Sequence, residues 1–395
     1  MVGVTPSTAA RRISSRKKAI YSLVVAITVF GMLESSARVN EIWMPPLRVD
    51  YGLGFDANSR LFQVDPSNPA MLHTAPDKLS NFLAQEFPAQ KPSGALRVAV
   101  LGGSSVYQLK NELDELKSRL SDQFSGRFEN IEIINAGGLA YGSHRLVPIL
   151  LELFEYDLDL VIIYTGHNEF EEVEQLELAN LQLLTVNRGL AHFASVRFIR
   201  DCLARAKIRQ LKAEHNHRIM ASDNRPFGAN YVRSWQHRWT REEVDDRMNH
   251  FRQNLLTLIQ LCRTRNIPVV MGTVPSNLVR PALAENVTPE IREKYQAALD
   301  NYSRGNFSEA QNMVREILQD SLGRHQSSDR ENGIIRNLAL QHQVPLADVE
   351  KAVMEHEPHG VPGMTLFLDH CHLNIHGRRI WRETFEREMI SLIGQ

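Results

Sequence analysis

The sequence predicts an α/β fold in which helices cover both faces of a parallel sheet. From Arg97 onward, short apolar runs alternate with helical stretches, and this alternation is typical of parallel sheets. Several of these runs are followed closely by small or polar turn residues, so the chain can reverse direction there. The predicted buried strands are residues 98–101, 131–135, 158–164, 268–273 and 344–349.

The clearest helix is predicted from Thr240 to about Arg263. Thr240 and Glu243 have the spacing of a capping box, in which each side chain binds the backbone N–H of the other residue. Apolar residues follow at helical spacing, at Phe251, Leu255, Leu258 and Leu261.

The composition is that of a globular protein. The chain has 395 residues, of which 43% are hydrophobic and 23% charged, so it can bury a large core divided among two or three domain-sized units. The net charge of −1 argues against nucleic acid as a partner. Three cysteines allow at most one disulfide, for which Cys202–Cys262 is a candidate.

The N-terminus has the pattern of an export or anchoring signal. Residues 1–18 carry five basic residues and no acidic one, and residues 19–33 contain no charged residue. Three interpretations are open: an uncleaved signal anchor, a signal peptide cleaved near Ser35-Ser36-Ala37, or a buried core helix. The first two place the rest of the chain outside the cytoplasm, either held at the membrane or secreted.

Three further segments interrupt the regular pattern. Residues 38–96 are rich in proline, which predicts an irregular stalk or an edge wrapping. Residues 171–239 could form a lid over the site or a set of surface helices. Residues 290–340 are predicted as a helical hairpin. Its weak tetratricopeptide-like spacing at Tyr302, Gly305, Phe307 and Ala310 leaves a protein partner open.

Polar residues follow the predicted strands at one edge of the sheet, where α/β proteins place their ligands. The turns in question are Gly102-Gly103-Ser104-Ser105, residues 135–143, Gly166-His167-Asn168-Glu169, residues 274–277 and, near the C-terminus, Asp369-His370-Cys371-His372. Ser104 can be a helix N-cap or a nucleophile, since serine is favoured in both roles.

These residue types supply the parts of an acyl-transfer site. A serine hydroxyl needs an imidazole to accept its proton, and the imidazole needs a carboxylate to orient it. Asp369 and His372 lie three residues apart, so one turn can bring them together. We therefore predict Ser104 as nucleophile, His372 as general base and Asp369 as its orienting group, with Ser105 the better candidate for helix capping.

The developing oxyanion needs preorganised hydrogen-bond donors. The candidates are the Ser104 N–H, an amide of the 136–140 turn, and the side chain of Asn168. Candidate substrate-lining residues are Gly103, Ser105, His167, Asn277 and His370. Non-catalytic interpretations also stay open: Asn168 as a turn residue, Asp369 as a helix cap, and His370-x-His372 as part of a metal site.

Taken together, these blocks resemble the SGNH hydrolases, the GDSL esterase/lipase superfamily. The resemblance spans roughly residues 97–393. It aligns Gly102-Gly103-Ser104 with the family's Gly-Asp-Ser block, 135–142 with its glycine block, 166–169 with its Gly-x-Asn-Asp block, and 369–372 with its Asp-x-x-His block. The form is closest to a bacterial, often membrane-anchored subgroup with Gly-Gly-Ser-Ser and Gly-His-Asn-Glu-Phe blocks.

The resemblance implies a three-layer α/β/α, flavodoxin-like domain that hydrolyses carboxylic esters, with short acyl groups on a glycan or lipid as substrates. It implies Ser104 N–H, Ala140 N–H and Asn168 as oxyanion donors, and neither a metal nor an organic cofactor. Two alternatives remain: an O-acyltransferase acting on an extracytoplasmic polysaccharide, and a catalytically silent binding or scaffold protein that uses the 290–340 helices.

The chain departs from the family pattern at three positions. Gly103 replaces the usual acid before the nucleophile, and Glu169 replaces the Asp after Asn168. Ala140 stands where the family usually has the oxyanion glycine. If the backbone φ at Ala140 is positive, the Cβ atom strains the turn.

Overall fold

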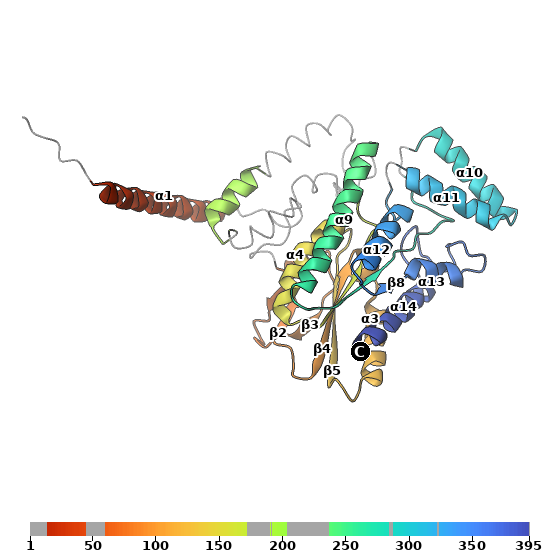
Figure 1. The fold of residues 1–395 in the computed structure, drawn as a ribbon, viewed down its shortest axis with the longest axis horizontal. Helices are drawn as coiled ribbons and strands as arrows, with labels where there is room; N and C mark the ends of the chain where they lie inside the picture. The colour runs from red at the N-terminus through yellow and green to blue at the C-terminus, as the bar shows by residue number, and fades with distance from the viewer. Residues whose placement is uncertain are drawn as a thin grey trace, which may run out of the picture.

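The core of the protein is a five-stranded parallel sheet with the order β5-β4-β6-β7-β8 (Figure 1). The computed structural model describes residues 14–44, 60–171, 190, 192–203, 237–283, 287–321 and 324–394. The strands are β4 Ala95–Gly102, β5 Asn130–Gly137, β6 Leu160–Tyr164, β7 Val269–Gly272 and β8 Leu346–Ala347. In chain order within this sheet the arrangement is 2-1-3-4-5, which is the flavodoxin-like order. The predicted α/β fold is confirmed.

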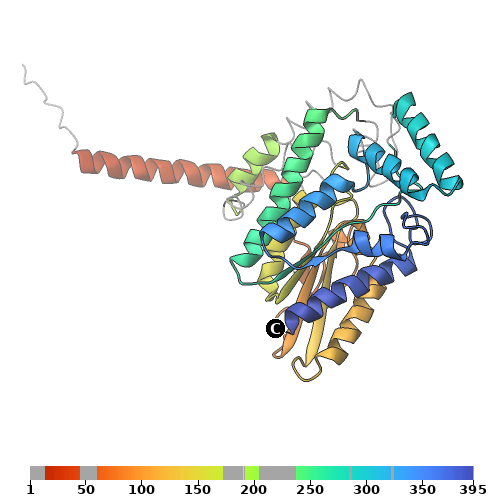
Figure 2. The same ribbon diagram turned by 45° about the vertical axis from the view of Figure 1, so that its right-hand side comes forward.

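Helices cover both faces of this sheet and make a three-layer domain (Figures 1 and 2). One face carries α3 Lys110–Gln123 and α14 Ile375–Ile393, with α13 Val349–His356 packed against α14. The other carries α4 Ser143–Leu153, α9 Arg241–Arg263 and α12 Asp329–Gln341. α9 begins after the predicted capping box of Thr240 and Glu243, in which both reciprocal hydrogen bonds are present.

Residues 60–88 correct the expectation of an irregular stalk. They form a small antiparallel sheet of β1 Phe62–Val64, β2 Met71–Thr74 and β3 Glu86–Pro88, with the 3₁₀ turn η2 Pro76–Lys78 between β2 and β3. Phe62 and Phe87 are buried against Tyr156, which ends the short 3₁₀ helix η3 Phe154–Tyr156. The prolines lie at strand ends and turns, where a missing N–H costs no ladder bond.

The predicted 290–340 insertion is a hairpin that ends earlier than expected. α10 Pro289–Ser303 and α11 Phe307–Asp320 pack against each other, and Gly305 turns the chain between them with φ +84°. Together with Leu278 and Val361 from neighbouring loops, they form a second small hydrophobic cluster beside the main core. α12, by contrast, packs on α9 and β7 and belongs to the sheet domain.

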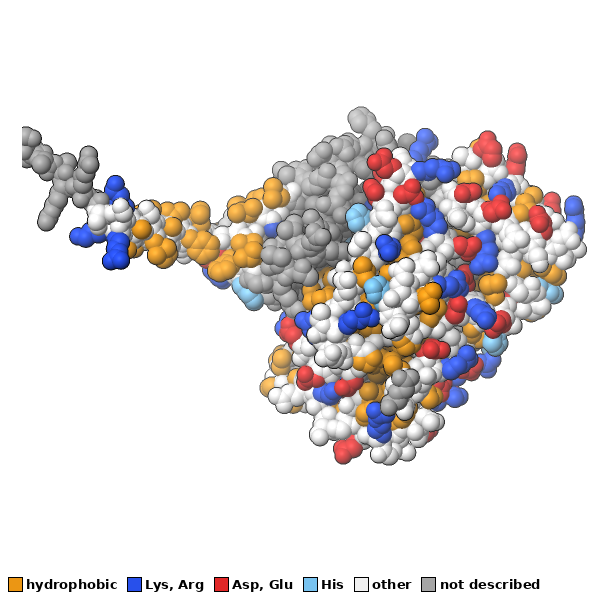
Figure 3. All heavy atoms as spheres, viewed as in Figure 1, with side chains coloured by type: hydrophobic (Ala, Val, Ile, Leu, Met, Phe, Trp, Pro, Cys, Tyr) orange, Lys and Arg blue, Asp and Glu red, His pale blue; other side chains and the backbone are white. Residues whose placement is uncertain are grey.

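α1 (Ser15–Trp43) is a 29-residue helix that projects from the domain (Figures 1 and 3). It is long and apolar enough to cross a membrane, with a mean hydropathy of 1.6 over its most apolar window, and none of that window is buried. The core-helix interpretation is therefore wrong.

Two other expectations concern the middle of the chain. The predicted lid lies mostly outside the described residues, which between 171 and 239 include only 171, 190, 192–203 and 237–239. All three cysteines are free, with Cys202 exposed and Cys262 buried, so the Cys202–Cys262 disulfide is not formed.

Candidate active site

Ser104 lies at the carboxyl end of β4, where the strand passes directly into the short helix α2 (Ser104–Tyr107). In the strand register Gly102 is paired with both Gly137 of β5 and Tyr164 of β6, so three strand-end turns meet at one level. A Cβ on Gly102 would lie 2.2 Å from the Tyr164 carbonyl oxygen, so the close approach requires glycine. Gly103 is the N-cap and no side chain caps α2, which corrects the assignment of Ser105 to that role.

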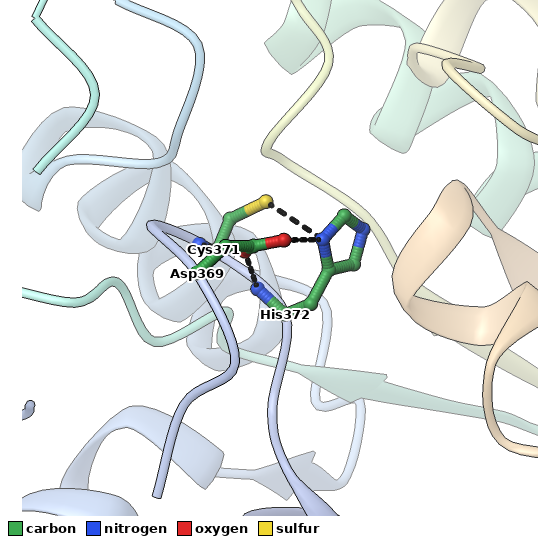
Figure 4. A group of neighbouring side chains, drawn as sticks. All are labelled: Asp369, Cys371 and His372. Carbon is green, nitrogen blue, oxygen red and sulfur yellow. Dashed lines mark hydrogen bonds and ion pairs between the residues drawn. The ribbon is translucent and has the colours of Figure 1, made fainter. Parts of the chain in front are cut away.

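His372 links Ser104 to Asp369 through two short hydrogen bonds. Its Nε2 atom is 2.7 Å from the Ser104 hydroxyl oxygen, and its Nδ1 atom is 2.7 Å from Asp369 Oδ2. Figure 4 shows the carboxylate aimed at Nδ1, while the opposite edge of the ring faces away from it. When Nδ1–H donates to the carboxylate, Nε2 keeps its lone pair for the serine proton.

The turn that carries this pair is closed by its own backbone. The carboxylate oxygen Oδ1 of Asp369 accepts hydrogen bonds from the backbone N–H groups of Cys371 at 2.9 Å and His372 at 2.8 Å. Burial alone would raise the pKa of Asp369, but the His372 side chain and these two N–H groups lower it well below its usual value. Asp369 is therefore ionised at neutral pH, although its side chain is 45% exposed.

Asn277 supports this turn and does not line the site. It is fully buried, its side-chain amide donates to the Asp369 carbonyl at 2.9 Å, and its backbone N–H donates to the His370 carbonyl at 2.9 Å. Its Oδ1 atom accepts from the backbone N–H groups of Val279 and Arg280. The prediction of Asn277 as a substrate-lining residue is thus corrected, because its amide is used within the protein.

The predicted oxyanion donors gather around Gly103. The first N–H groups of a helix have no partner within the helix, which leaves the Ser104 N–H available at the start of α2. The Asn168 amide nitrogen donates to the Tyr141 carbonyl at 3.2 Å and carries a second hydrogen. A Cβ on Gly103 would lie 2.2 Å from that nitrogen, so Asn168 reaches over the residue next to Ser104.

Ala140 has a positive φ of 58°. The condition for backbone strain is therefore met, since a left-handed conformation costs a residue with a Cβ about 1–2 kcal/mol. Around it, the N–H groups of Gly138, Leu139 and Tyr141 donate to backbone carbonyls, whereas within the described part of the chain no acceptor is recorded for the Ala140 N–H. The strained turn thus leaves this amide as a candidate donor.

Glu169, which stands where the SGNH pattern described above has Asp, fixes the start of α4. Its two carboxylate oxygens accept from the Ser143 backbone N–H at 2.9 Å and the Ser143 hydroxyl at 2.7 Å, and that hydroxyl also accepts from Asn254. Burial raises the pKa of Glu169 to about 7, against the lowering effect of the Ser143 hydrogen bonds. The residue fixes the position of Ser143, which directly follows the 138–142 turn, and the sequence offered no signal for this role.

The remaining candidates surround the triad at different depths. His167 is buried, and its Nδ1 atom accepts from the Ser327 N–H at 3.1 Å. Burial, with His372 and His370 nearby, lowers the pKa of His167 to about 3, so the ring is neutral. Ser105 and His370 are partly buried, and burial also lowers the pKa of His370.

Asp369, Cys371 and His372 place three metal-ligand types within 4.8 Å of one another. The Cys371 sulfur is 3.6 Å from His372 Nδ1, and both are drawn in Figure 4. Burial raises the pKa of the Cys371 thiol, which disfavours the thiolate that a metal needs. The Nδ1 proton shared with Asp369 occupies the lone pair a metal would use, so the residues fit a hydrogen-bonded pair better. His370 is not part of this group.

Comparisons with known proteins returned structures of similar architecture. No family model and no curated protein matches the sequence. A GDSL-like lipase from Bacteroides thetaiotaomicron has 11% identity and a TM-score of 0.35, over 75% of this chain and 88% of that one. An acetyl xylan esterase has 14% identity and a TM-score of 0.36, over 75% of this chain and all of that one.

A catalytic mutant of an acetylxylan esterase from Geobacillus stearothermophilus has 10% identity and a TM-score of 0.38, over 74% of this chain and 94% of that one. At such identities and TM-scores these likenesses do not assign a chemistry to this chain. The assignment rests on the geometry of the residues described above.

Proposed function

We propose that the protein is a serine esterase that hydrolyses carboxylic esters through an acyl-enzyme. The observation that carries the proposal is the continuous hydrogen-bonded chain from Ser104 Oγ through His372 to Asp369, with 2.7 Å at each link. Ser104 meets a turn that lies 268 residues further along the chain, and the three side chains have the distances and the order of roles that nucleophilic catalysis requires.

The reaction follows from these roles. Ser104 Oγ attacks the ester carbonyl carbon while its proton passes to His372 Nε2, and Asp369 stabilises the imidazolium that forms. The oxyanion receives hydrogen bonds from the Ser104 and Ala140 amides and from Asn168. The C–O bond to the alcohol then breaks, and His372 returns the proton to the leaving alcohol. Water repeats the sequence on the acyl-enzyme, releases the carboxylic acid and restores Ser104.

We propose short acyl esters, such as acetyl groups on a glycan or lipid, as the substrate class. This choice follows the family resemblance of the four sequence blocks. Transfer of the acyl group to a sugar hydroxyl would use the same triad and is the second candidate. Its support is α1, which would hold the site near membrane-bound acceptors.

We propose further that α1 is an uncleaved anchor, with the catalytic domain outside the cytoplasm. Basic residues Arg16, Lys17 and Lys18 stand at its start, as expected for the cytoplasmic end. The helix continues without a break through the candidate cleavage site at 35–37, where Ala37 is buried. A peptidase needs accessible, extended backbone, so this geometry supports retention of the anchor.

The proposed function is tested by labelling the full chain with a fluorophosphonate probe. Wild type and Ser105→Ala are expected to be labelled, and Ser104→Ala is not. Hydrolysis of a soluble acetyl ester should fall in Ser104→Ala by several orders of magnitude, on the order of 10⁶ as for other serine hydrolases. Ser105 is the matched control because it is the next residue in the same short helix.

Other outcomes would direct the assignment elsewhere. An unlabelled wild type of native fold would point to a silent binding protein. Labelling at Ser104 with product formed only when a polysaccharide acceptor is added would point to the transferase.

A further inference from the structure

The helix of residues 194–203 exposes large apolar side chains and buries charged ones. Its exposed large apolar side chains include Phe198 at 40%, Ile199 at 59% and Leu203 at 67% exposure. Its buried residues include Arg197 and Asp201. A surface helix of a water-soluble protein normally turns its apolar face inward and its charges outward. The reverse arrangement is expected where the outer surroundings are apolar.

This helix is fastened to α1 at its N-terminus. Both carboxylate oxygens of Glu34 accept hydrogen bonds from the first backbone amides of the helix, Ala194 N–H at 2.9 Å and Ser195 N–H at 3.0 Å. The Ser195 hydroxyl adds a third bond at 2.9 Å. A carboxylate in α1 thus caps the 194–203 helix, and its charge is satisfied by protein groups.

Further contacts set the rotation of the helix about its axis. Arg197 makes two bonds to the Glu41 carboxylate, at 2.7 and 2.9 Å, which draws its charged face toward α1. The Phe193 ring packs edge-on against Phe30 of α1, with 5.4 Å between the ring centres. Because Arg197 and the start of the helix are bound to α1, the helix is held with the side chains at 198, 199 and 203 exposed.

The exposed apolar surface is continuous with that of α1. Figure 3 shows hydrophobic side chains running along α1 and onto the neighbouring helix. The uncharged run of α1 from residue 19 to 33 is about 22 Å long, at 1.5 Å per residue. The hydrocarbon core of a bilayer is about 30 Å thick, so the uncharged run is shorter than this core, although the whole of α1 is long enough to span it. The 194–203 helix joins α1 just beyond this run, at the charged residues Glu34 and Glu41.

We propose that the 194–203 helix lies in the lipid interface beside α1, so that the protein contacts the bilayer through two elements. The occupant of the exposed face is lipid: acyl chains surround Phe198, Ile199 and Leu203, while Arg197 remains paired with Glu41. The inference rests on the proposed anchoring by α1 and is independent of the proposed esterase activity.

The test measures the depth of a fluorescent label in the full chain reconstituted into vesicles of phosphatidylethanolamine and phosphatidylglycerol. Ile199→Cys and Leu203→Cys are made in a Cys202→Ser background and labelled with bimane. The matched control is Leu340→Cys on α12, since Leu340 is an apolar side chain with 80% exposure. Iodide probes access from water, and lipids carrying a nitroxide on the acyl chain probe access from the bilayer.

Labels at 199 and 203 are expected to be quenched strongly by the nitroxide lipid and several-fold less by iodide than the label at 340. If iodide quenches 199 and 203 as it does 340, the inference is wrong while anchoring by α1 stands. Protection from both quenchers would show that another copy or protein covers the face, which also overturns it. A chain that does not remain with the vesicles overturns the anchoring and the inference together.

Hydrolysis of a soluble acetyl ester is measured on the same samples. It reports the esterase proposal separately, while circular dichroism shows that each labelled variant is folded. Active variants with water-exposed labels would contradict the lipid contact alone, whereas inactive variants with lipid-quenched labels would contradict the esterase alone.

Discussion

The side-chain amide of Asn168 fills the space that a side chain at Gly103 would need. A Cβ added to Gly103 would lie 2.2 Å from the Asn168 amide nitrogen and 3.0 Å from the Tyr141 carbonyl oxygen. Because Gly103, the residue before the proposed nucleophile, has no side chain, the Asn168 amide can lie next to its backbone. Gly103 and the proposed oxyanion donor Asn168 therefore depend on each other, since the space that glycine leaves is the space that the amide occupies.

Gly103→Ala is expected to displace Asn168 and lower kcat about 10²–10³-fold with little change in KM, as for loss of one oxyanion donor. Asn168→Ala should cost a similar factor. The double variant should cost little more than either single one, because both remove the same interaction. Gly126→Ala is the control, since nothing lies within 4 Å of its added Cβ. Additive losses in steady-state kinetics would contradict the coupling.

Ala140→Gly is expected to leave the protein slightly more stable, by up to about 1 kcal/mol, with activity retained. Glycine removes the left-handed strain of about 1–2 kcal/mol, and the greater freedom of the unfolded chain offsets about 0.4–1 kcal/mol. Ala297→Gly, within α10, should instead destabilise by about 1 kcal/mol. Urea unfolding measures both. Equal destabilisation of the two variants would show that Ala140 carries no strain.

Asn277→Ala is expected to lower kcat about 10²-fold, because releasing the Asp369–His370 turn misplaces the general base. The rate of fluorophosphonate labelling should fall by the same factor, since labelling depends on the same base. Asn301→Ala removes a partly buried amide from the α10–α11 hairpin and should leave both rates unchanged. A fall in ester hydrolysis with normal labelling would place Asn277 in substrate binding instead.

Glu169→Gln is expected to become relatively more stable than wild type as the pH rises from 5 to 8. The pKa of Glu169 is raised to about 7 from 4.5, so the folded state binds more protons than the unfolded state between these values. Wild-type stability at this group is therefore full below about pH 4.5 and falls as pH rises through 7, by about 3 kcal/mol in total. Glutamine does not titrate.

The measurement is the free energy of unfolding in urea at pH 5, 6, 7 and 8 for both proteins. Their difference isolates residue 169, because the other groups titrate alike in both. Glu86→Gln, at an exposed position of β3, serves as the surface control. A difference that does not change with pH would mean that Glu169 is ionised throughout.

The parts of the fold that the sequence predicts are those encoded locally. The five strands and α9 have short apolar runs, turn residues and a capping box within one segment, and all are present near the predicted bounds. The juxtaposition of Ser104 with the Asp369–His372 turn was predicted because parallel strands bring their carboxyl ends to one edge. Both turns lie there.

What the sequence left out depends on bonds between distant side chains and backbone. Asn277 was placed in the site by its position after a strand, yet its amide serves a carbonyl 92 residues away. Glu169 and Ser143 are 26 residues apart in the sequence, and Glu34 and Ala194, which also share a hydrogen bond, are 160 residues apart. Similarly, β1 to β3 are 3 or 4 residues long, too short for a periodic pattern, and are held by buried aromatic rings.

Both ends of β4 have a role beyond the sheet itself. At its start, the buried Arg97 side chain binds Glu132 of β5 and the carbonyls of Tyr156 and Pro88, which ties the small sheet to the large one. At its other end, Gly103 connects β4 to Ser104. All eight residues of the strand are buried. A substitution in this strand therefore disturbs architecture and chemistry at once. Across natural variants of this chain, residues 97–104 should be the stretch where sequence changes least, whereas the α10–α11 hairpin, which packs outside the main core, is freer to diverge.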